Sequence, residues 1–531
     1  MNKVPTSEYA AQARLVQAWR EGMRNQGKQR AVRLIETHIS WVLLAGHYAY
    51  KVKKALDLGF LNFTGLETRR YFCAEEIRLN RRLAPEVYID VIAIGGNSEN
   101  PQEGAQPVIE YAVKMRRFSV SRQFDSLIMR NKILPQHIDS LAATISRFHM
   151  SLPSSELTSL YGTAERIRLD AAQNFEQIGL LLNEQVDMDK LAEIRKASEQ
   201  EYIACRGVFE QRHVQGFVRE CHGDLHLGNI VLIDGQATPF DSIEFNPALR
   251  WIDVMSEIAF TVMDLLHHQR AALAYRFLNA YVEATGDFSG IRVLRFYLAY
   301  RAMVRAKVGA IRAAQAGLTL AVAKSERAGC RNYMEFVASC FAVKRPALII
   351  THGLPGSGKT TFSQMALERL QLIRLRSDVE RKRLFGLGPL ADSCANDGVD
   401  LYSAEVTRRT YVRLLELARA LLMAGYPVVV DAAFPKQDER ELFRQLAQEL
   451  QVGFVIASIQ ASNEILRERI IRRQLAANDA SEADIDVLEK LQHTHQPLSA
   501  AEQSQAVCFI NEGKGFTDDA AWKSLYRLLD K

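Results

Sequence analysis

The chain has 531 residues, of which 48% are hydrophobic and 24% charged, with a net charge of +5. This length exceeds what a single core supports and predicts two to four domains. The small positive charge does not favour a nucleic-acid partner, and no apolar run is long enough for a transmembrane helix. The cysteines are scattered singly, without zinc-type spacing. We therefore expect a reduced cytoplasmic protein with no membrane partner.

The first predicted strands surround a short polar turn. Residues 31–36 and 41–44 are apolar-rich runs that flank Thr37-His38-Ile39-Ser40. A hairpin turn at 45–47 then leads into a third strand, residues 48–54. Ala49 and Lys51 share one face of this strand, because side chains alternate along it. A small residue leaves room for adenine and a lysine can reach phosphates, as in the small lobe of a kinase. Lys53 lies on the same face and is an alternative to Lys51.

A helix predicted over residues 68–83 supplies a carboxylate partner for that lysine. We expect Glu76 to hold it, with Glu75 as the rival one step round the helix. Residues 95–104 follow as a turn region rich in Gly, Asn and Glu. Residues 107–115 then resemble the strand and hinge that connect kinase lobes, and helices are expected from 136 to about 210.

The strongest signal in the first half is His222-Gly223-Asp224-Leu225-His226-Leu227-Gly228-Asn229. An apolar strand at 230–233 follows, and then Asp241. In phosphoryl transfer, Asp224 in this pattern can accept the proton of an attacking hydroxyl, while Asn229 and Asp241 hold Mg²⁺ against the phosphates. Alone, each of these residues could equally be a turn former or a cap. Their spacing together with an upstream lysine favours a kinase.

From about Val32 to Asp264 these motifs resemble the aminoglycoside phosphotransferase family, a branch of the protein-kinase-like fold. The resemblance implies a phosphate-orienting pair, a base and two metal ligands: Lys51 with Glu76, Asp224, and Asn229 with Asp241. It also implies that Asp253 braces the catalytic loop.

The sequence departs from the kinase pattern at one point, because no glycine-rich loop precedes the lysine. The turn at 37–40 would then cover the phosphates. No aminoglycoside pocket is identifiable, so drug resistance is not implied. The motifs T-H-I-S-W, Y-K-V-K-K and F-D-S-I-E-F are most similar to those of a group often fused to a nucleotide-binding domain.

Helices are expected from Ser256 to about Ala342, and Pro346 marks a boundary. The apolar run 347–351 then precedes a glycine-rich stretch that fits G-x-x-x-x-G-K-[ST] at every fixed position. A strand that turns into a helix in this way directs backbone N–H groups and the helix dipole at a polyphosphate. Lys359 would reach the terminal phosphates and the Thr360 hydroxyl would bind Mg²⁺. The expected nucleotide-binding residues are Gly353, Gly356, Ser357, Gly358, Lys359, Thr360 and Thr361.

Beyond this P-loop, strands are predicted at 372–376, 428–431 and 454–459, with a helix at 404–423. Asp378 follows the first of these strands, where a parallel sheet faces its ligand. An arginine-dense helix begins at 466, and guanidinium groups stabilise charge on a transferring phosphoryl group.

This half resembles the small P-loop kinases grouped with polynucleotide kinases, zeta toxins and gluconate kinases, through S-D-x-x-R, V-V-V-D-A-A and R-x-x-x-R. The resemblance implies a base at Asp378 and a substrate contact at Arg381. It also implies lid arginines at Arg469 and Arg473, which would contact the nucleotide. The resemblance leaves two roles for Asp431, a place in the Mg²⁺ shell or a contact with the substrate.

The sequence thus predicts a mixed α/β and α+β protein with two domains. Residues 1–342 form a two-lobed protein-kinase-like domain, and residues 346–531 form a three-layer α/β/α P-loop domain with a parallel sheet. Each domain would use ATP and Mg²⁺ to phosphorylate a hydroxyl of a small molecule or nucleotide, with a protein as another possible acceptor. The alternative is that the first domain is a non-catalytic nucleotide sensor that regulates a P-loop kinase or ATPase.

Overall fold

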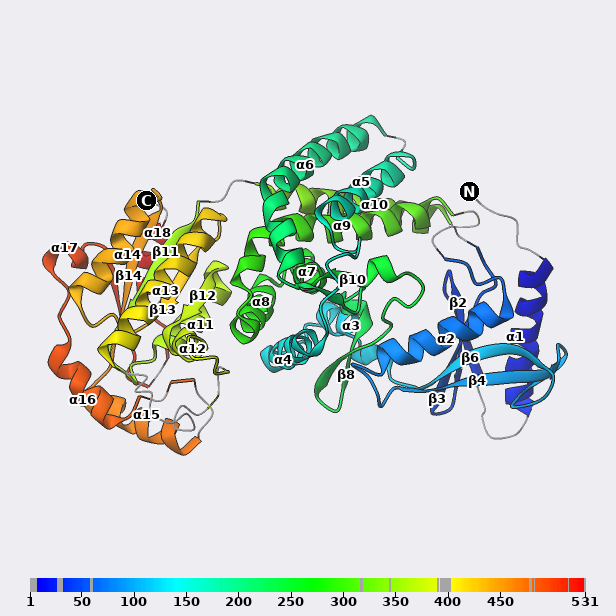
Figure 1. Cartoon of the computed structure of the whole chain (residues 1–531), viewed down its shortest axis with the longest axis horizontal. Coiled ribbons are helices and arrows are strands. Elements are labelled where there is room, and N and C mark those ends of the chain that lie inside the picture. The colour runs from blue at the N-terminus through cyan, green and yellow to red at the C-terminus, as the bar shows by residue number, and fades with distance from the viewer. Residues whose placement is uncertain are drawn as a thin grey trace. The chain divides into compact units, whose positions relative to one another are not determined.

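The computed structural model describes residues 7–25, 32–57, 61–182, 184–315, 319–342, 345–388, 391, 403–476, 480–481, 483–513 and 515–529. Two compact units make up the chain, Met1–Leu181 with Tyr202–Asp264, and Leu182–Glu201 with Leu265–Lys531 (Figure 1). The boundary predicted from sequence stays a prediction, because residues 343–344 lie outside the described ranges. Within those ranges, no helix is both long enough and apolar enough to cross a membrane.

The first unit contains a six-stranded antiparallel sheet with the order β1-β2-β3-β6-β4-β5. Its strands are β1 (Val32–Glu36), β2 (Ser40–Ala45), β3 (Tyr48–Lys53), β4 (Tyr88–Asn97), β5 (Asn100–Glu103) and β6 (Val108–Arg116). The strands predicted around the 37–40 turn and at 107–115 are confirmed.

The turn region expected at 95–104 is wrong, because β4 and β5 pair there as a hairpin. Gly95 allows it, since a Cβ at this position would lie 1.7 Å from the carbonyl oxygen of Ala105. The glycines that suggested a loop therefore permit close backbone packing within a sheet.

Two helices pack against this sheet, and each contacts a different set of side chains from β3. Tyr50 and Val52 pack in one cluster with Trp19 of α1 (Ser7–Asn25). Ala49 packs in another cluster with Cys73 of α2 (Leu66–Asn80). Alternation along β3 therefore places its two lysines on the α2 face.

The second lobe of this unit frames one loop between short strands. The loop at residues 221–229 connects β7 to β8, and β7 pairs with β10 while β8 pairs with β9. The surrounding elements are α3 (Phe124–Met129), α4 (Pro135–Ser151), α5 (Ala164–Gly179), β7 (Val218–Glu220), β8 (Ile230–Ile233), β9 (Gln236–Pro239) and β10 (Trp251–Asp253). They also include residues 202–214 of α6 (Gln185–Val214) and 254–264 of α7 (Val254–His267), whose other residues belong to the second unit.

The second unit contains a parallel five-stranded sheet with the order β12-β13-β11-β14-β15. Its strands are β11 (Ala347–His352), β12 (Ile373–Arg376), β13 (Val428–Asp431), β14 (Gly453–Gln460) and β15 (Ala506–Ile510). Every strand predicted from the P-loop onward is present, because buried parallel strands read as continuous apolar runs.

Two pairs of helices pack against this sheet. Phe362 of α11 (Lys359–Leu370) stacks on Trp522 of α18 (Asp519–Leu529), with ring centroids 5.4 Å apart. The helices α13 (Ala404–Met423) and α14 (Gln437–Glu449) form the second pair, joined by the rings of Tyr411, Phe434 and Phe443. The remaining described helices from α8 onward are α8 (Ala271–Thr285), α9 (Ile291–Ala313), α10 (Leu320–Cys340), α12 (Ser377–Arg383), α15 (Asn463–Ala476), α16 (Ile485–Thr494) and α17 (Ala500–Gln503).

The outer edge of β12 is occupied by helix α8. The side chain of Asn279 donates to the carbonyl of Leu372 at 2.9 Å and accepts from the backbone N–H of Arg374 at 2.7 Å. Glu283, one turn later, accepts from the side chains of Arg374 and Arg376, each at 2.9 Å. One amide side chain thus satisfies both polar groups at an otherwise open strand edge.

Replacing Asn279 with Ala should destabilise the second unit by about 1–3 kcal/mol, since it leaves a buried N–H and a buried carbonyl without partners. Urea unfolding followed by circular dichroism measures this. Arg276→Ala is the comparison on the same helix, because it removes a partly exposed ion pair with Glu368. Equal stability of the two variants would contradict this role of Asn279.

Candidate functional site: two phosphate sites

The lysine on β3 lies between two carboxylates from separate parts of the chain. Lys51 Nζ is 2.9 Å from Glu76 Oε1 on α2 and 2.5 Å from Asp241 Oδ1. Although burial lowers it, the charges of Asp241 and Glu76 hold the pKa of Lys51 well above its usual range. The predicted lysine, glutamate and aspartate are therefore brought together, with the lysine charged.

A second lysine on the same strand extends this group of ion pairs. Lys53 Nζ is 2.6 Å from Glu76 Oε2 and also bonds Glu244. Burial would raise the pKa of Glu76, but Lys51 and Lys53 lower it to about 2. Both lysines thus contact Glu76, while Lys51 also contacts Asp241 and Lys53 contacts Glu244. Which of the two would reach phosphate stays a prediction. Glu244 was missed, although it stands three residues after Asp241 in F-D-S-I-E-F.

The choice between the two glutamates of α2 is decided by their partners. Glu76 is fully buried against both lysines. Glu75 instead pairs with Arg78 at 2.9 Å and lies 3.7 Å from Arg250. Glu76 is thus the partner of Lys51, as predicted.

The loop after β7 holds the predicted base beside the predicted metal ligand. Asn229 Nδ2 donates to the carboxylate and the carbonyl of Asp224, each at 3.0 Å. His226 Nε2 is 3.5 Å from the same carboxylate. His222 points inward, with Nε2 at 2.8 Å from the carbonyl of Phe240, next to Asp241. Asp224 is therefore fixed in orientation while its side chain stays partly exposed.

Two acids of α7 brace this loop, Glu257 and Asp264, and the Asp264 carboxylate accepts from the backbone N–H of Leu227 at 2.9 Å. Glu257 lies nearer the H-G-D motif. Its carboxylate accepts from the backbone N–H groups of His222 at 2.6 Å and Gly223 at 3.0 Å. One ligand-type atom from each of His149, Cys221 and Glu257 lies within 4.8 Å of the others. Because both oxygens of Glu257 already accept backbone hydrogen bonds, we assign this trio a structural role.

The bracing role expected of Asp253 is wrong. Its carboxylate accepts two hydrogen bonds from Arg212, at 2.7 and 2.8 Å, and one from the backbone N–H of Met255. Asp253 therefore fixes α6 to the start of α7, and Glu257, one turn further, supports the loop. No local motif marks Glu257, because its partners lie more than 30 residues earlier.

Asp241 combines backbone strain with an accessible carboxylate. Its φ of 65° is left-handed, and its N–H donates to the hydroxyl of Tyr88 at 3.0 Å. Such strain in a non-glycine residue is typical of functional sites. Its side chain is 43% exposed, so a cation could reach it. Because Nδ2 of Asn229 is engaged, its Oδ1 is the second candidate ligand, and such hard oxygen donors fit Mg²⁺.

The turn predicted to cover phosphates joins β1 and β2. Thr37 Oγ1 accepts from the backbone N–H of Ser40 at 3.0 Å, and Ser40 stands opposite Lys53 in the sheet. The turn is therefore tight and lies at the end of the strands nearest the lysines. Its contact with phosphate stays a prediction.

In the second unit the glycine-rich loop connects β11 to α11. Gly358 precedes the helix with a φ of 102°, and Lys359, Thr360 and Thr361 open it. Lys359 Nζ donates to the carbonyl of Leu354 at 2.9 Å, and burial lowers the pKa of this lysine. The backbone N–H groups at this helix start are those predicted to hold phosphate, and that contact stays a prediction.

The acidic residues at the ends of β12 and β13 have separate partners. Asp378 accepts from Arg381 at 2.9 Å, and Asp431 accepts from Ser363 of α11 at 3.0 Å. Burial raises the pKa of Asp378, but Arg381 and Arg376 lower it on balance, so it is a carboxylate. The predicted base and substrate-contacting arginine thus form an ion pair with each other.

The lid arginines differ in their contacts. Arg469 donates to the carbonyls of Gly356 at 3.2 Å and Asn511 at 3.0 Å, while Arg473 bonds the carbonyl of Ala483. Asn511 in turn donates to the carbonyl of Ser357 at 2.8 Å. Arg469 therefore lies on the P-loop, and Asn511, which no motif marked, supports both.

Comparison with known families finds a match within the second unit. Residues 348–498 match the family described as AAA domain. Two uncharacterised proteins, from Mycobacterium tuberculosis (strain ATCC 25618 / H37Rv) and Mycobacterium bovis (strain ATCC BAA-935 / AF2122/97), are each 28% identical over 448 residues. The match covers 84% of this chain and 87% of each relative.

Among solved structures, a choline/ethanolamine kinase family protein from Mesorhizobium loti is 12% identical, with a TM-score of 0.36 over 62% of this chain and 99% of its own. A gluconokinase from Sinorhizobium meliloti 1021 is 18% identical, with a TM-score of 0.26 over 35% of this chain and 95% of its own. The predicted fold class, mixed α+β and α/β, is confirmed, with an antiparallel sheet and helices in the first unit and a parallel P-loop sheet covered by helices in the second.

Gly358→Ala should weaken ATP binding at the P-loop about tenfold or more and lower stability by about 1–3 kcal/mol, because a Cβ there meets Asn511 Nδ2 at 2.2 Å and φ is left-handed. Calorimetric titration and thermal unfolding test this. Gly388→Ala is the control, since nothing lies within 4 Å of its Cβ. Retained affinity in Gly358→Ala would show that the cradle is not built as described.

The buried His222 in the 221–229 loop predicts a pH dependence of stability. Burial is the main reason that the pKa of His222 is lowered to about 4. The unfolded chain therefore binds more protons between pH 6.5 and 4, so stability falls as pH drops through this window, by up to about 1.4 kcal/mol per pH unit. Urea unfolding monitored by Trp fluorescence at several pH values should show a smaller slope for His222→Gln. The exposed His47 changed to Gln should leave the slope unchanged, and an unchanged slope in both would contradict the assignment.

Proposed function

We propose that the chain is a phosphotransferase with two ATP-dependent sites, each transferring the γ-phosphate to a hydroxyl acceptor. The observation that carries the proposal is the position of Lys51 Nζ between Glu76 and Asp241, in a unit whose loop also holds Asp224 against Asn229. A structural ion pair would need only two of these groups. A lysine, two metal-type oxygens and an oriented carboxylate together form the set that phosphoryl transfer requires.

In the first site the roles follow from the contacts. Lys51, oriented by Glu76, would bind nucleotide phosphates. Asp224 would accept the proton of the acceptor hydroxyl, because Asn229 and the neighbouring His226 orient its carboxylate. Asp241 and Asn229 would hold Mg²⁺, which neutralises charge on the phosphates when bound.

In the second site the backbone of the P-loop would hold the phosphates, with Lys359 and Thr360 at its end. Asp378 would be the acceptor's base and Arg381 a substrate contact, so binding of an acceptor would have to compete with their ion pair. Asp431, bonded to Ser363 on the P-loop helix, would lie in the Mg²⁺ shell. Arg469 would contact the nucleotide from its place against Gly356.

A change at Asp224, the proposed base of the first site, distinguishes an enzyme from a nucleotide sensor. In a Lys359→Ala background that silences the P-loop, Asp224→Asn should keep Mg²⁺-ATP affinity but slow transfer about 10²–10⁴-fold. Affinity is measured by calorimetry, and transfer by a screen of metabolites, nucleotides and proteins with γ-labelled ATP. Asp234→Asn, an exposed aspartate in the β8–β9 turn, is the matched control.

Two outcomes would count against this proposal. Turnover unaltered by Asp224→Asn would remove Asp224 as the base. Nucleotide binding without any Asp224-dependent transfer to the whole set of acceptors would favour the non-catalytic sensor.

A further inference from the structure

Helix α2 carries a second set of charges beyond Glu76, and these meet the strand that enters the catalytic loop. Arg78 donates two hydrogen bonds to the carboxylate of Glu220, at 2.8 and 3.0 Å. Glu220 ends β7, two residues before His222. Such a paired contact fixes both distance and orientation.

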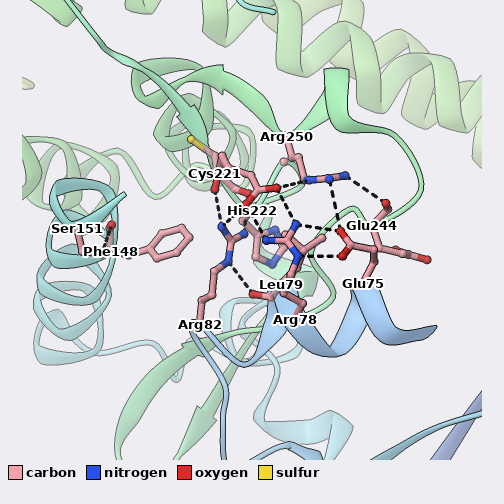
Figure 2. Close-up of polar contacts among 12 residues, drawn as sticks. Glu75, Arg78, Leu79, Arg82, Phe148, Ser151, Cys221, His222, Glu244 and Arg250 are labelled. Atoms are coloured by element: carbon pink, nitrogen blue, oxygen red, sulfur yellow. Dashed lines mark hydrogen bonds and ion pairs between the residues drawn. The ribbon is translucent and has the colours of Figure 1, made fainter. Parts of the chain in front are cut away.

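Two further arginines, Arg82 and Arg250, also bond Glu220 (Figure 2). Arg82 donates to the carbonyls of Glu220 at 2.8 Å and Cys221 at 3.2 Å. Arg250 donates to the carboxylate of Glu220 at 3.0 Å and to the carbonyl of Glu244 at 3.1 Å. One carboxylate thus connects α2, the catalytic loop and the segment after Asp241.

The segment around Arg250 also supports the loop directly. The N–H of Cys221 donates to the carbonyl of Arg250 at 2.8 Å. A Cβ on Gly223, whose φ is 91°, would lie 2.8 Å from the carbonyl of Leu249. The glycine of the H-G-D motif therefore permits close contact between these two segments.

The environment of Glu220 distinguishes this cluster from a solvated surface pair. Its side chain is 13% exposed and that of Arg250 is 7% exposed. Burial would raise the pKa of Glu220, but hydrogen bonds from Arg78 and Arg250 lower it to about 2. An ion pair shielded in this way is screened little by salt.

We propose that Glu220 is a positioning residue that sets the place of α2, and through it the Lys51–Glu76 pair, relative to Asp224. The inference rests on the proposed function of the first site. Glu76 and Arg78 belong to the same helix, so a change at Glu220 reaches Lys51 through a rigid element.

The test is a double-mutant cycle in the full chain with Lys359→Ala, which leaves the first site as the nucleotide binder. Glu220→Gln should weaken Mg²⁺-ATP binding about five- to tenfold, in the range of usual coupling between sites. Lys51→Met alone should also weaken it. In the Lys51→Met background, Glu220→Gln should weaken Mg²⁺-ATP binding by less than a further factor of about two, because its effect acts through that lysine. Glu67→Gln, in an exposed pair on the same helix, is the control and should change nothing.

The positioning role would be overturned if Glu220→Gln lowered Mg²⁺-ATP affinity equally with and without Lys51→Met, or if it lowered the affinity in neither background. If Glu220→Gln does not fold, Arg78→Gln replaces it, since that side chain is 47% exposed. Failure of the proposed function has a different signature, namely that Lys51→Met leaves nucleotide binding unchanged.

Discussion

The first unit depends on a group of buried ion pairs, in which Glu76 of α2 lies between Lys51 and Lys53 of β3. Lys53 and Glu76 are each fully buried, and Lys51 nearly so. Removing one partner from such an arrangement leaves a buried charge uncompensated, at a cost of about 3–5 kcal/mol. The sheet and α2 must therefore stay together, and the lysine that faces Asp241 cannot leave its place without disturbing the core.

The sequence predicted the elements whose chemistry is local. The alternation of Ala49 and Lys51, the H-G-D loop and the P-loop each specify a backbone shape within a few residues, and the structure has all three. Residues that act across the chain were missed. Glu257, Glu220 and Asn511 contact partners that lie 30 to 154 residues away in the chain, and no motif marks them. The misassignment at Asp253 has the same cause. Asp253 and Glu257 are both acidic residues near the start of α7, and only their distant partners, Arg212 and His222, distinguish them.

The second unit shows how far a site extends beyond its motifs. The AAA domain match begins at residue 348, yet Asn279 and Glu283 bond β12 from helix α8. Glu283 holds Arg376, the residue directly before Ser377 and Asp378. The segment proposed to supply the base is therefore oriented in part by residues that no comparison of the P-loop domain would include.

As proposed, the two sites would obtain phosphate affinity by different physical means. The P-loop uses consecutive backbone N–H groups at one helix start, so a single motif specifies nearly all of it. The first site uses side-chain charges from β3, α2, the loop after β7 and the segment at Asp241. Because those groups repel or attract one another strongly, they hold their geometry only where further contacts fix each element. The arginines around Glu220 and the carboxylate of Glu257 provide such contacts, so side chains from four separate segments of the chain keep one arrangement.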